Sequence, residues 1–400
     1  MNLKNSLSTT AQTLFTKEFI KNPYPAYKKL RESHSIYPTL FPSGEHGWII
    51  TRYEDAVDAL KDNRFIKDNS KLAGGNMEHE SIFTHNMLFA DPPDHKRLRG
   101  LVQKEFTPKM IEGMRQRIQA ITDQLLSEVS DKGSLNLIDD FAFPLPIIVI
   151  SEMLGVPTED RDKFRIWSNS LIEGSNGDND DLIYQHMNEF IHYLGEWFGK
   201  VRKTPVPGLI SRLIHTEGSD DQLTEQELYG VVSLLIIAGH ETTVNLIGNS
   251  ILALLENPEQ LQLLIEKPEL IHSALEELLR YNGPVEFSTS RWVSEDLVFK
   301  GIEMSKGELV VVALNSANHD PNQMEDPEIL NITREKSRHL AFGTGIHLCL
   351  GAPLARLEGE IAISSLLKRF PHIELSIHPN ELEWRPGMIV RGVKEIPLSI

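Results

Sequence analysis

The sequence has very little cysteine: Cys349 is the only one in 400 residues. A single cysteine excludes an internal disulfide framework and fits a reducing compartment, so we expect a cytoplasmic protein. Basic residues are also in deficit, with 40 Lys and Arg against 57 Asp and Glu and a formal net charge of −17. Because a nucleic-acid-binding surface needs excess positive charge to displace counterions, this balance argues against DNA or RNA as a partner.

Long apolar runs are absent as well. The N-terminal residues contain no stretch long enough for a signal peptide or a membrane span. The most apolar window, VVSLLIIAG at residues 231–239, is shorter than the roughly 20 residues needed to cross a bilayer, and Glu241 follows it closely. We therefore expect no membrane anchor. Because no internal repeat and no linker rich in Gly, Ser or Pro divides the chain, residues 1–400 are predicted to form a single domain.

Helical periodicity, interrupted by proline-containing turns, dominates what is present. Strand-like runs are fewer: GWIITRY from Gly47, LVFKGIEM from Leu297 and GELVVVALNSAN from Gly307. These patterns predict a mainly α fold with a minor β-sheet region. Two polar stretches, residues 67–86 and 173–181, are predicted to be surface excursions, either functional lids or plain solvated connections.

One predicted helix is long and has an unusual centre. Thr224 and Glu227 fit a capping box, and an apolar pattern continues from them to the stop signal Asn257-Pro258. In the middle lie Ala238, Gly239, Glu241, Thr242 and Thr243. A glycine inside a helix costs about 1 kcal/mol relative to alanine. A glycine, an acid and two hydroxyls suit a groove that holds a ligand and handles protons, although a helix-packing glycine beside a solvated edge would leave the same pattern.

Three motifs resemble those of the cytochromes P450. The pattern Phe342-x-x-Gly345-x-His347-x-Cys349-x-Gly351 is similar to the family's haem-binding loop, with five residues at fixed spacing. The segment from Ala238 to Thr243 resembles its oxygen-activating motif, and Glu277-x-x-Arg280 resembles its structural Glu-x-x-Arg motif. The resemblance extends from about Asn22 to the C-terminus. It implies a triangular prism of about a dozen helices around a buried haem b.

The haem contacts follow from this resemblance. Cys349 would be the thiolate ligand of the iron; since a free thiol has a pKa of about 8.5, the anion needs stabilisation, which a helix beginning near Gly351 would provide. Gly345 and Gly351 would let the main chain approach the porphyrin. The remaining predicted haem contacts are Phe342 on the cysteine side, Ala238 and Gly239 on the opposite side, and His95, Arg99, Arg291 and His347 at the propionates. His95 and Arg99 lie four residues apart, so they share one helix face.

The predicted chemistry is a monooxygenation. Thiolate ligation favours cleavage of the O–O bond, and Thr242, with Glu241 as proton supplier and Thr243 as support, would deliver protons. The two electrons would come from a separate ferredoxin or flavodoxin with its reductase. We expect basic residues near Cys349 to steer an acidic donor, scattered surface charge being the alternative: Lys104, Lys109, Arg115, Arg117, Lys336, Arg338 and Arg356. Glu277, Arg280 and Arg334 are expected to form a structural network, and the protein to be a monomer.

The family layout also implies a substrate pocket. Its predicted lining is Leu88, Phe89, Ile237, Ala238, Val285, Phe287, Ser288, Met388 and Ile389. These mainly apolar side chains predict a hydrophobic small molecule. The chain looks most like soluble bacterial members associated with polyketide or macrolide tailoring in Bacillus, while fatty acids, steroids and terpenoids stay open. The alternatives are a haem-thiolate peroxygenase or desaturase and a non-catalytic haem-thiolate binding protein.

Overall fold

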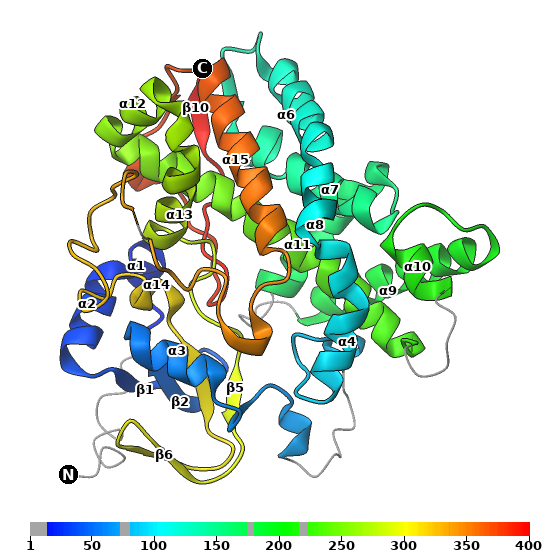
Figure 1. Ribbon diagram of the computed structural model, residues 1–400, viewed down its shortest axis with the longest axis vertical. Helices are drawn as coiled ribbons and strands as arrows, with labels where there is room; N and C mark the ends of the chain where they lie inside the picture. The colour runs from blue at the N-terminus through cyan, green and yellow to red at the C-terminus, as the bar shows by residue number, and fades with distance from the viewer. Residues whose placement is uncertain (1–13, 73–80, 174–179, 216–221, 336) are drawn as a thin grey trace.

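A computed structural model describes residues 14–72, 81–173, 180–215, 222–335 and 337–400 (Figure 1). The helices are α1 (Lys17–Lys21), α2 (Tyr24–Ser33), α3 (Tyr53–Lys61), α4 (Asp94–Gln103), α5 (Pro108–Gly113), α6 (Arg115–Val129), α7 (Pro144–Leu154), α8 (Arg161–Glu173), α9 (Asp180–Lys203), α10 (Leu209–His215), α11 (Glu225–Glu256), α12 (Pro258–Glu266), α13 (Ile271–Tyr281), α14 (Leu314–Ala317) and α15 (Ala352–Arg369). The strands are β1 (Ile36–Leu40), β2 (His46–Ile50), β3 (Phe65–Ile66), β4 (Ser134–Asn136), β5 (Arg291–Val293), β6 (Leu297–Phe299), β7 (Ile302–Met304), β8 (Leu309–Val312), β9 (Glu374–Leu375) and β10 (Pro397–Ser399). The predicted mainly α fold with a minor sheet region is confirmed.

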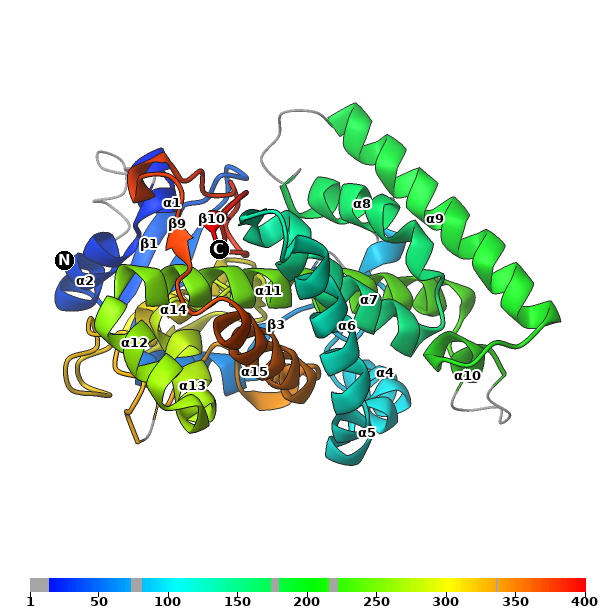
Figure 2. The same ribbon diagram turned by 90° about the horizontal axis from the view of Figure 1, so that it is seen from above.

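Helix α11 is the central element of the molecule. The capping box is present, because the Glu227 N–H donates to the Thr224 hydroxyl at 3.2 Å while the Glu227 carboxylate accepts from the Thr224 N–H at 2.8 Å. By length and composition α11 could cross a membrane, yet 72% of its most apolar window is buried inside the protein. It packs against α7, α13 and α15, and Figure 2 shows it passing through the middle of the helical body. Its apolar character therefore reflects burial in the core.

A five-stranded sheet with the order β1-β2-β8-β5-β3 flanks the helical body. The neighbours β2 and β8 are parallel, while the other pairs are antiparallel. A Cβ at Gly47 would come within 2.3 Å of the Leu309 carbonyl oxygen, so the close approach of β2 and β8 requires glycine. Alternate side chains of these strands enter two separate apolar clusters, one on each face of the sheet. The sheet is therefore buried on both sides.

The strand predictions are mostly confirmed. The run from Leu297 forms the hairpin β6–β7, with Lys300 and Gly301 at positive φ in the turn. The run from Gly307 is a strand only as far as Val312, because its second half becomes helix α14. Residues 73–80 and 174–179 of the two predicted surface excursions lie outside the described residues.

Candidate active site

A tight loop places Cys349 directly before helix α15. The Cys349 N–H donates to the Phe342 carbonyl oxygen at 2.9 Å. Gly345 has φ +75°, and a Cβ there would lie 3.0 Å from the Leu60 carbonyl oxygen, so this corner of the loop favours glycine. As predicted, α15 begins directly after Gly351, which is its N-cap residue. The loop holds the sulfur beside a helix N-terminus.

The groups around the Cys349 thiol have opposite effects on its pKa. Burial raises its pKa, whereas the N–H groups of Gly351 and Ala352 and the guanidinium of Arg99 lower it. Burial prevails, so the helix N-terminus alone does not create a thiolate. A cation at the sulfur is needed to favour the anion, and a haem iron is such a cation.

The thiol lines a cavity between this loop and α11. The predicted haem and catalytic residues that line it are His95, Arg99, Ala238, Gly239, Thr242, Thr243, Arg291, Phe342, His347, Cys349 and Gly351. These residues come from α4, α11, β5 and the cysteine loop, which lie far apart in the sequence. Two predicted residues, Gly345 and Glu241, are not part of this lining.

Nitrogen donors collect at one end of the cavity. His95 and Arg99 extend from α4, and Arg291 from β5. The His95 ring lies edge-on to the His347 ring, with 4.4 Å between centroids. His95 Nε2 and Arg291 Nε are both buried and have no hydrogen-bond partner within the described ranges. Buried donors without partners are costly, so this end of the cavity is suited to an anionic ligand.

The pKa values at this end point the same way. Burial, followed by the charges of Arg291 and its other cationic neighbours, lowers the pKa of His347 to about 2. Burial likewise lowers the pKa of Arg291 to about 10, although the Asp91 carboxylate acts against it. The pKa of His95 is lowered by burial and by Arg99. A carboxylate bound among these groups would raise their pKa values again and so favour their protonated, charged forms.

The residues present therefore fit a haem. A sulfur faces one side of the cavity, an apolar helix bounds the other, and unpartnered buried donors lie at one edge. This combination matches a flat apolar macrocycle that carries a thiolate-binding metal and two carboxylates.

On α11, the hydroxyl of Thr242 donates to the Ala238 carbonyl oxygen at 3.1 Å. Thr242 is part of the cavity lining, and this i−4 bond directs its hydroxyl along the helix. Gly239 lines the cavity too, and a Cβ there would lie 2.8 Å from the Ile150 side chain of α7, so it also permits close helix packing. The two interpretations of this glycine thus both apply.

Glu241 faces away from the cavity. Its Oε2 accepts from Arg385 Nη1 at 2.8 Å, and its Oε1 lies 3.3 Å from His240 Nε2. Burial alone would raise the pKa of this carboxyl, but the neighbouring His240 and, after it, Arg385 lower it to about 2. Glu241 also lines a separate polar cavity of about 240 Å³, together with Asp139 and Arg165. In this structure the predicted proton supplier is an ion-paired carboxylate.

The predicted substrate residues divide into groups. Those that line the cysteine-side cavity are Leu88, Ala238, Val285, Ser288 and Ile389. Phe89 and Ile237 are not in this lining. The structure corrects the placement of Phe287 and Met388, which lie on the other side of a two-strand wall formed by residues 285–288 and 388–390. Along residues 388–390 neighbouring side chains line different cavities, as the alternation of an extended chain requires. Along residues 285–288 the two end residues line the cysteine-side cavity, while Glu286 and Phe287 line the other one.

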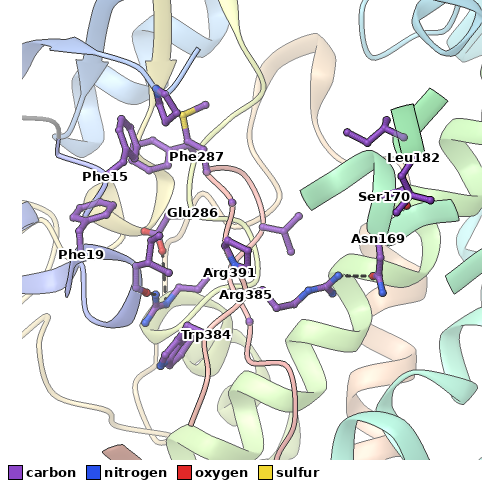
Figure 3. A pocket seen from close by; sticks show the side chains of 18 residues that line it. Phe15, Phe19, Asn169, Ser170, Leu182, Glu286, Phe287, Trp384, Arg385 and Arg391 are labelled. Atoms are coloured by element: carbon purple, nitrogen blue, oxygen red, sulfur yellow. Dashed lines mark hydrogen bonds and ion pairs between the residues drawn. The ribbon is translucent and has the colours of Figure 1, made fainter. Parts of the chain in front are cut away.

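Phe287 and Met388 line a second cavity of about 570 Å³ (Figure 3). It is bounded by α1, by α8 and by the C-terminal segment 384–392. Figure 3 shows Arg385 directed toward Asn169 and Arg391 toward Glu286, with Arg391 Nε 3.6 Å from a Glu286 carboxylate oxygen. Arg385 borders both this cavity and the polar cavity around Glu241.

The predicted structural network forms. Glu277 and Arg280 are fully buried, and Arg280 Nε and Nη2 donate to the Glu277 carboxylate at 2.8 and 2.7 Å. Ser337 Oγ donates to the same carboxylate at 2.8 Å, the Asn331 N–H at 3.1 Å, and Arg334 Nε at 3.3 Å. The three predicted residues are thus brought together at one buried carboxylate.

Ion pairs occupy several of the basic residues expected to steer a redox donor. Arg115 pairs with Glu112 and Glu360. Arg117 pairs with Glu152, and Arg356 with Glu276. Lys336 lies outside the described residues. Lys104, Lys109 and Arg338 are exposed and have no ion pair in the described part of the chain.

Three residues that the sequence did not single out lie at these sites: Lys67, Thr289 and Arg385. Lys67 was assigned to a surface excursion, yet it is 2% exposed. No sequence signal marked it, because the two-residue strand β3 that precedes it is too short to be recognised from its pattern. Arg385 could not have been found from spacing, since its partner Glu241 is 144 residues away.

Comparisons with known proteins agree with the geometry. The cytochrome P450 family model matches residues 10–161 and 178–398. The polyketide biosynthesis cytochrome P450 PksS of Bacillus subtilis (strain 168) is 43% identical over 394 residues, covering 96% of this chain and 97% of that protein. Its solved structure superposes with a TM-score of 0.90, at 44% identity and with 96% and 98% of the two chains covered.

Two further proteins show the breadth of the relatives. The cytochrome P450 monooxygenase PikC of Streptomyces venezuelae is 40% identical over 385 residues, covering 96% of this chain and 92% of its own. The crystal structure of myxobacterial CYP267B1 in complex with myristic acid has a TM-score of 0.92 at 40% identity, with 96% and 98% of the chains covered. The matches extend over nearly the whole chain, and the site described above has the sulfur and the donors that a haem requires. The chain belongs to the cytochrome P450 family of haem-thiolate monooxygenases.

Proposed function

We propose that this protein, folded as a single domain, inserts one oxygen atom from O2 into a polyketide- or macrolide-like molecule. The observation that carries the proposal is the position of Cys349 across one cavity from Thr242, with unpartnered buried donors at the edge of the same cavity. Cys349 would hold a haem there, with His95, Arg99, Arg291 and His347 at its propionates, and that group would supply oxygen activation. Phe342, stacked under the Arg356 guanidinium at 4.4 Å, supports the cysteine side.

The Thr242 hydroxyl is proposed to hold a proton where oxygen reacts. Its present bond to the Ala238 carbonyl oxygen lies along the helix and can be exchanged for a bond into the cavity by rotation about one side-chain torsion. A hydroxyl both accepts and donates, so Thr242 can orient a water and pass a proton onward. Thr243, buried and part of the same lining, supports the shape of this turn.

Glu241 is proposed to connect this turn to solvent. The polar cavity beside it offers a route for protons, but a carboxyl with a pKa of about 2 scarcely binds a proton at neutral pH. Proton transfer therefore requires Glu241 to lose its interactions with His240 and Arg385, since burial then raises the pKa of the carboxyl. Arg385 lies on the C-terminal segment next to the second cavity, where a local displacement can release it.

The substrate assignment depends on the apolar lining and on relatives. Leu88, Val285 and Ile389 are apolar, and the Ser288 hydroxyl already accepts the Val312 N–H at 3.0 Å. PksS and PikC carry names that place them in polyketide biosynthesis and among monooxygenases, respectively, which favours a polyketide. The myristic acid bound to CYP267B1 keeps a fatty acid as the second candidate. A spin-state binding screen across polyketides, fatty acids, steroids and terpenoids tests the assignment; preferential binding of any class but polyketides would refute it.

Thr242→Ala tests the catalytic role, with Thr242→Ser as the control that keeps the hydroxyl. NADH consumption, hydrogen peroxide release and product formation are measured with a reconstituted donor, and again with hydrogen peroxide alone. We expect Thr242→Ala to retain the haem spectrum and to release peroxide in place of product, while Thr242→Ser stays close to the wild type. If product formation in Thr242→Ala stays coupled to NADH consumption as in the wild type, the proposed catalytic role of Thr242 is refuted. Turnover driven only by peroxide would favour the peroxygenase alternative. Unsaturated products would favour the desaturase, and absence of turnover in both systems would favour the non-catalytic binding protein.

We further propose that an acidic ferredoxin or flavodoxin docks beside the cysteine loop. Lys104, Lys109 and Arg338 are exposed charges in this region, and Ile346 is 43% exposed on the loop itself. Charge reversal of Lys104 or Arg338 should weaken donor binding at low ionic strength, because long-range attraction between exposed charges is screened by salt. Arg117→Glu is the control, since its charge is already compensated by Glu152. Equal effects in all three variants would contradict the assignment. We also propose that the protein is a monomer in the cytoplasm. Sedimentation with a purified donor tests the oligomeric state.

A further inference from the structure

Two cations face each other where strand β3 ends and strand β5 begins. These strands are antiparallel, with Phe65 opposite Val293 and Ile66 opposite Trp292. Continuing the register by one residue places Lys67 opposite Arg291. The two side chains are 2% and 4% exposed. Like charges directly opposite each other in a sheet are destabilising, and burial increases the cost, so this pair requires a compensating anion.

The ammonium of Lys67 is directed at the segment that leads into β5. Its Nζ donates to the Thr289 hydroxyl oxygen and, at 2.7 Å, to the Ser290 carbonyl oxygen. Because the Thr289 oxygen accepts this bond from an ammonium, the hydroxyl proton must point elsewhere. Thr289 lines the haem cavity, next to Arg291. The hydroxyl is therefore prepared to donate into the cavity.

The nearby carboxylate does not neutralise this group. Asp91 accepts from the backbone N–H groups of Lys67 and Asp68, at 3.0 and 3.1 Å, and lies 3.4 Å from Lys71 Nζ. It thus ties β3 to the start of α4, while its charge is shared with an exposed lysine. Burial, followed by the charge of Arg291, keeps the pKa of Lys67 well below its ordinary value. Arg291 Nε has no hydrogen-bond partner in the described ranges, so it can act as a second donor to the same anion.

We propose that Lys67 and Thr289 are positioning residues for a haem propionate: the lysine fixes the threonine so that its hydroxyl donates to the carboxylate, and its charge balances that carboxylate together with Arg291. The inference rests on the haem placement proposed above. It assigns a role to a lysine that makes no contact with the reacting atoms. The propionate is then held from α4, β3 and β5 at once, which connects haem retention to the edge of the five-stranded sheet.

The test compares Lys67→Met and Thr289→Val with two controls. Lys67→Arg restores the charge, and Lys71→Met removes a lysine that is 44% exposed and pairs with the same Asp91. Haem transfer from each holoenzyme to apomyoglobin and the midpoint potential of the haem iron are measured. We expect Lys67→Met to lose haem about tenfold faster or more, the scale of one charge-assisted hydrogen bond. Its midpoint potential should become more negative, because a removed cation favours the ferric form, and Lys67→Arg should recover most of both changes.

Each outcome decides the inference. A wild-type transfer rate and potential in Lys67→Met would overturn it, as would faster haem loss with an unchanged potential, because a purely structural role moves only the former. Reconstitution with the dimethyl ester of haem provides a second readout: the difference between Lys67→Met and wild type should disappear, and its persistence would also overturn the inference. The reduced carbon-monoxide spectrum of the wild type separates this failure from failure of the haem placement itself.

Discussion

Replacing Glu277 with alanine should be among the most destabilising single substitutions in this protein. The carboxylate is fully buried and compensates the guanidinium of Arg280, which is fully buried as well. Burial raises the pKa of Glu277, but hydrogen bonds and charge from Arg280 outweigh it, so the carboxylate is charged in the folded state. Breaking a buried pair by removing one partner costs about 3–5 kcal/mol, because the other charge is left without compensation. That is a large part of a total stability of roughly 5–15 kcal/mol.

The assay is urea unfolding of the holoenzyme, followed by tryptophan fluorescence and by the haem Soret band. Glu276→Ala is the matched control, because Glu276 directly precedes Glu277 on α13 and its carboxylate, 33% exposed, pairs with Arg356 and His339. We expect this variant to lose about 1 kcal/mol of unfolding free energy. Adding Arg280→Met to Glu277→Ala should restore about 2 kcal/mol relative to the sum of the two single losses, because the fully buried guanidinium is then absent. Additive losses, or a Glu277→Ala variant as stable as the control, would refute the reasoning.

Two further predictions concern the site. Cys349→Ser should abolish the carbon-monoxide spectrum typical of thiolate ligation, since a serine hydroxyl does not ionise at neutral pH; a retained spectrum would mean that another residue holds the iron. Glu241 has a pKa of about 2 when folded and an ordinary value of 4.5, so its carboxylate contributes stability that is complete above pH 4.5 and is lost as the pH falls toward 2. Acid unfolding of Glu241→Gln should therefore lack about 3 kcal/mol of the wild-type pH dependence in that range, and identical profiles would count against the pairing of Glu241 with His240 and Arg385.

The local signals in the sequence predicted much of the site. The capping box located the start of α11, and the glycines around Cys349 located the loop and the first turn of α15. These features depend on residues within a few positions of each other, so spacing determines them. The predicted grouping of His95, Arg99, Arg291 and His347 required the family resemblance, because α4, β5 and the cysteine loop meet only in the fold.

The remaining features depend on contacts that no spacing encodes. The pairing of Arg385 with Glu241 and that of Lys67 with Thr289 each join segments more than 100 residues apart. The misplacement of Phe287 and Met388 has a different cause: the segments were right, but the side of the wall that each residue faces depends on how the two segments pair. In the same way, the expected positive surface was overestimated, because the sequence does not show which arginines pair with acids.

The two-strand wall between the cavities has a consequence for selection experiments. Glu286 N–H donates to the Ile389 carbonyl oxygen at 2.8 Å, and Val285 bridges Val390, so the register of the wall is fixed. Ser288 and Ile389 face the haem side, while Phe287 and Met388 face the outer cavity. A complete mutational scan should therefore alternate between the two properties along residues 388–390. Along residues 285–288, product regiochemistry should respond at Val285 and Ser288, and the rate of substrate uptake at Glu286 and Phe287. Adjacent residues such as Phe287 and Ser288 would then determine two different properties of the enzyme independently, substrate uptake and product regiochemistry.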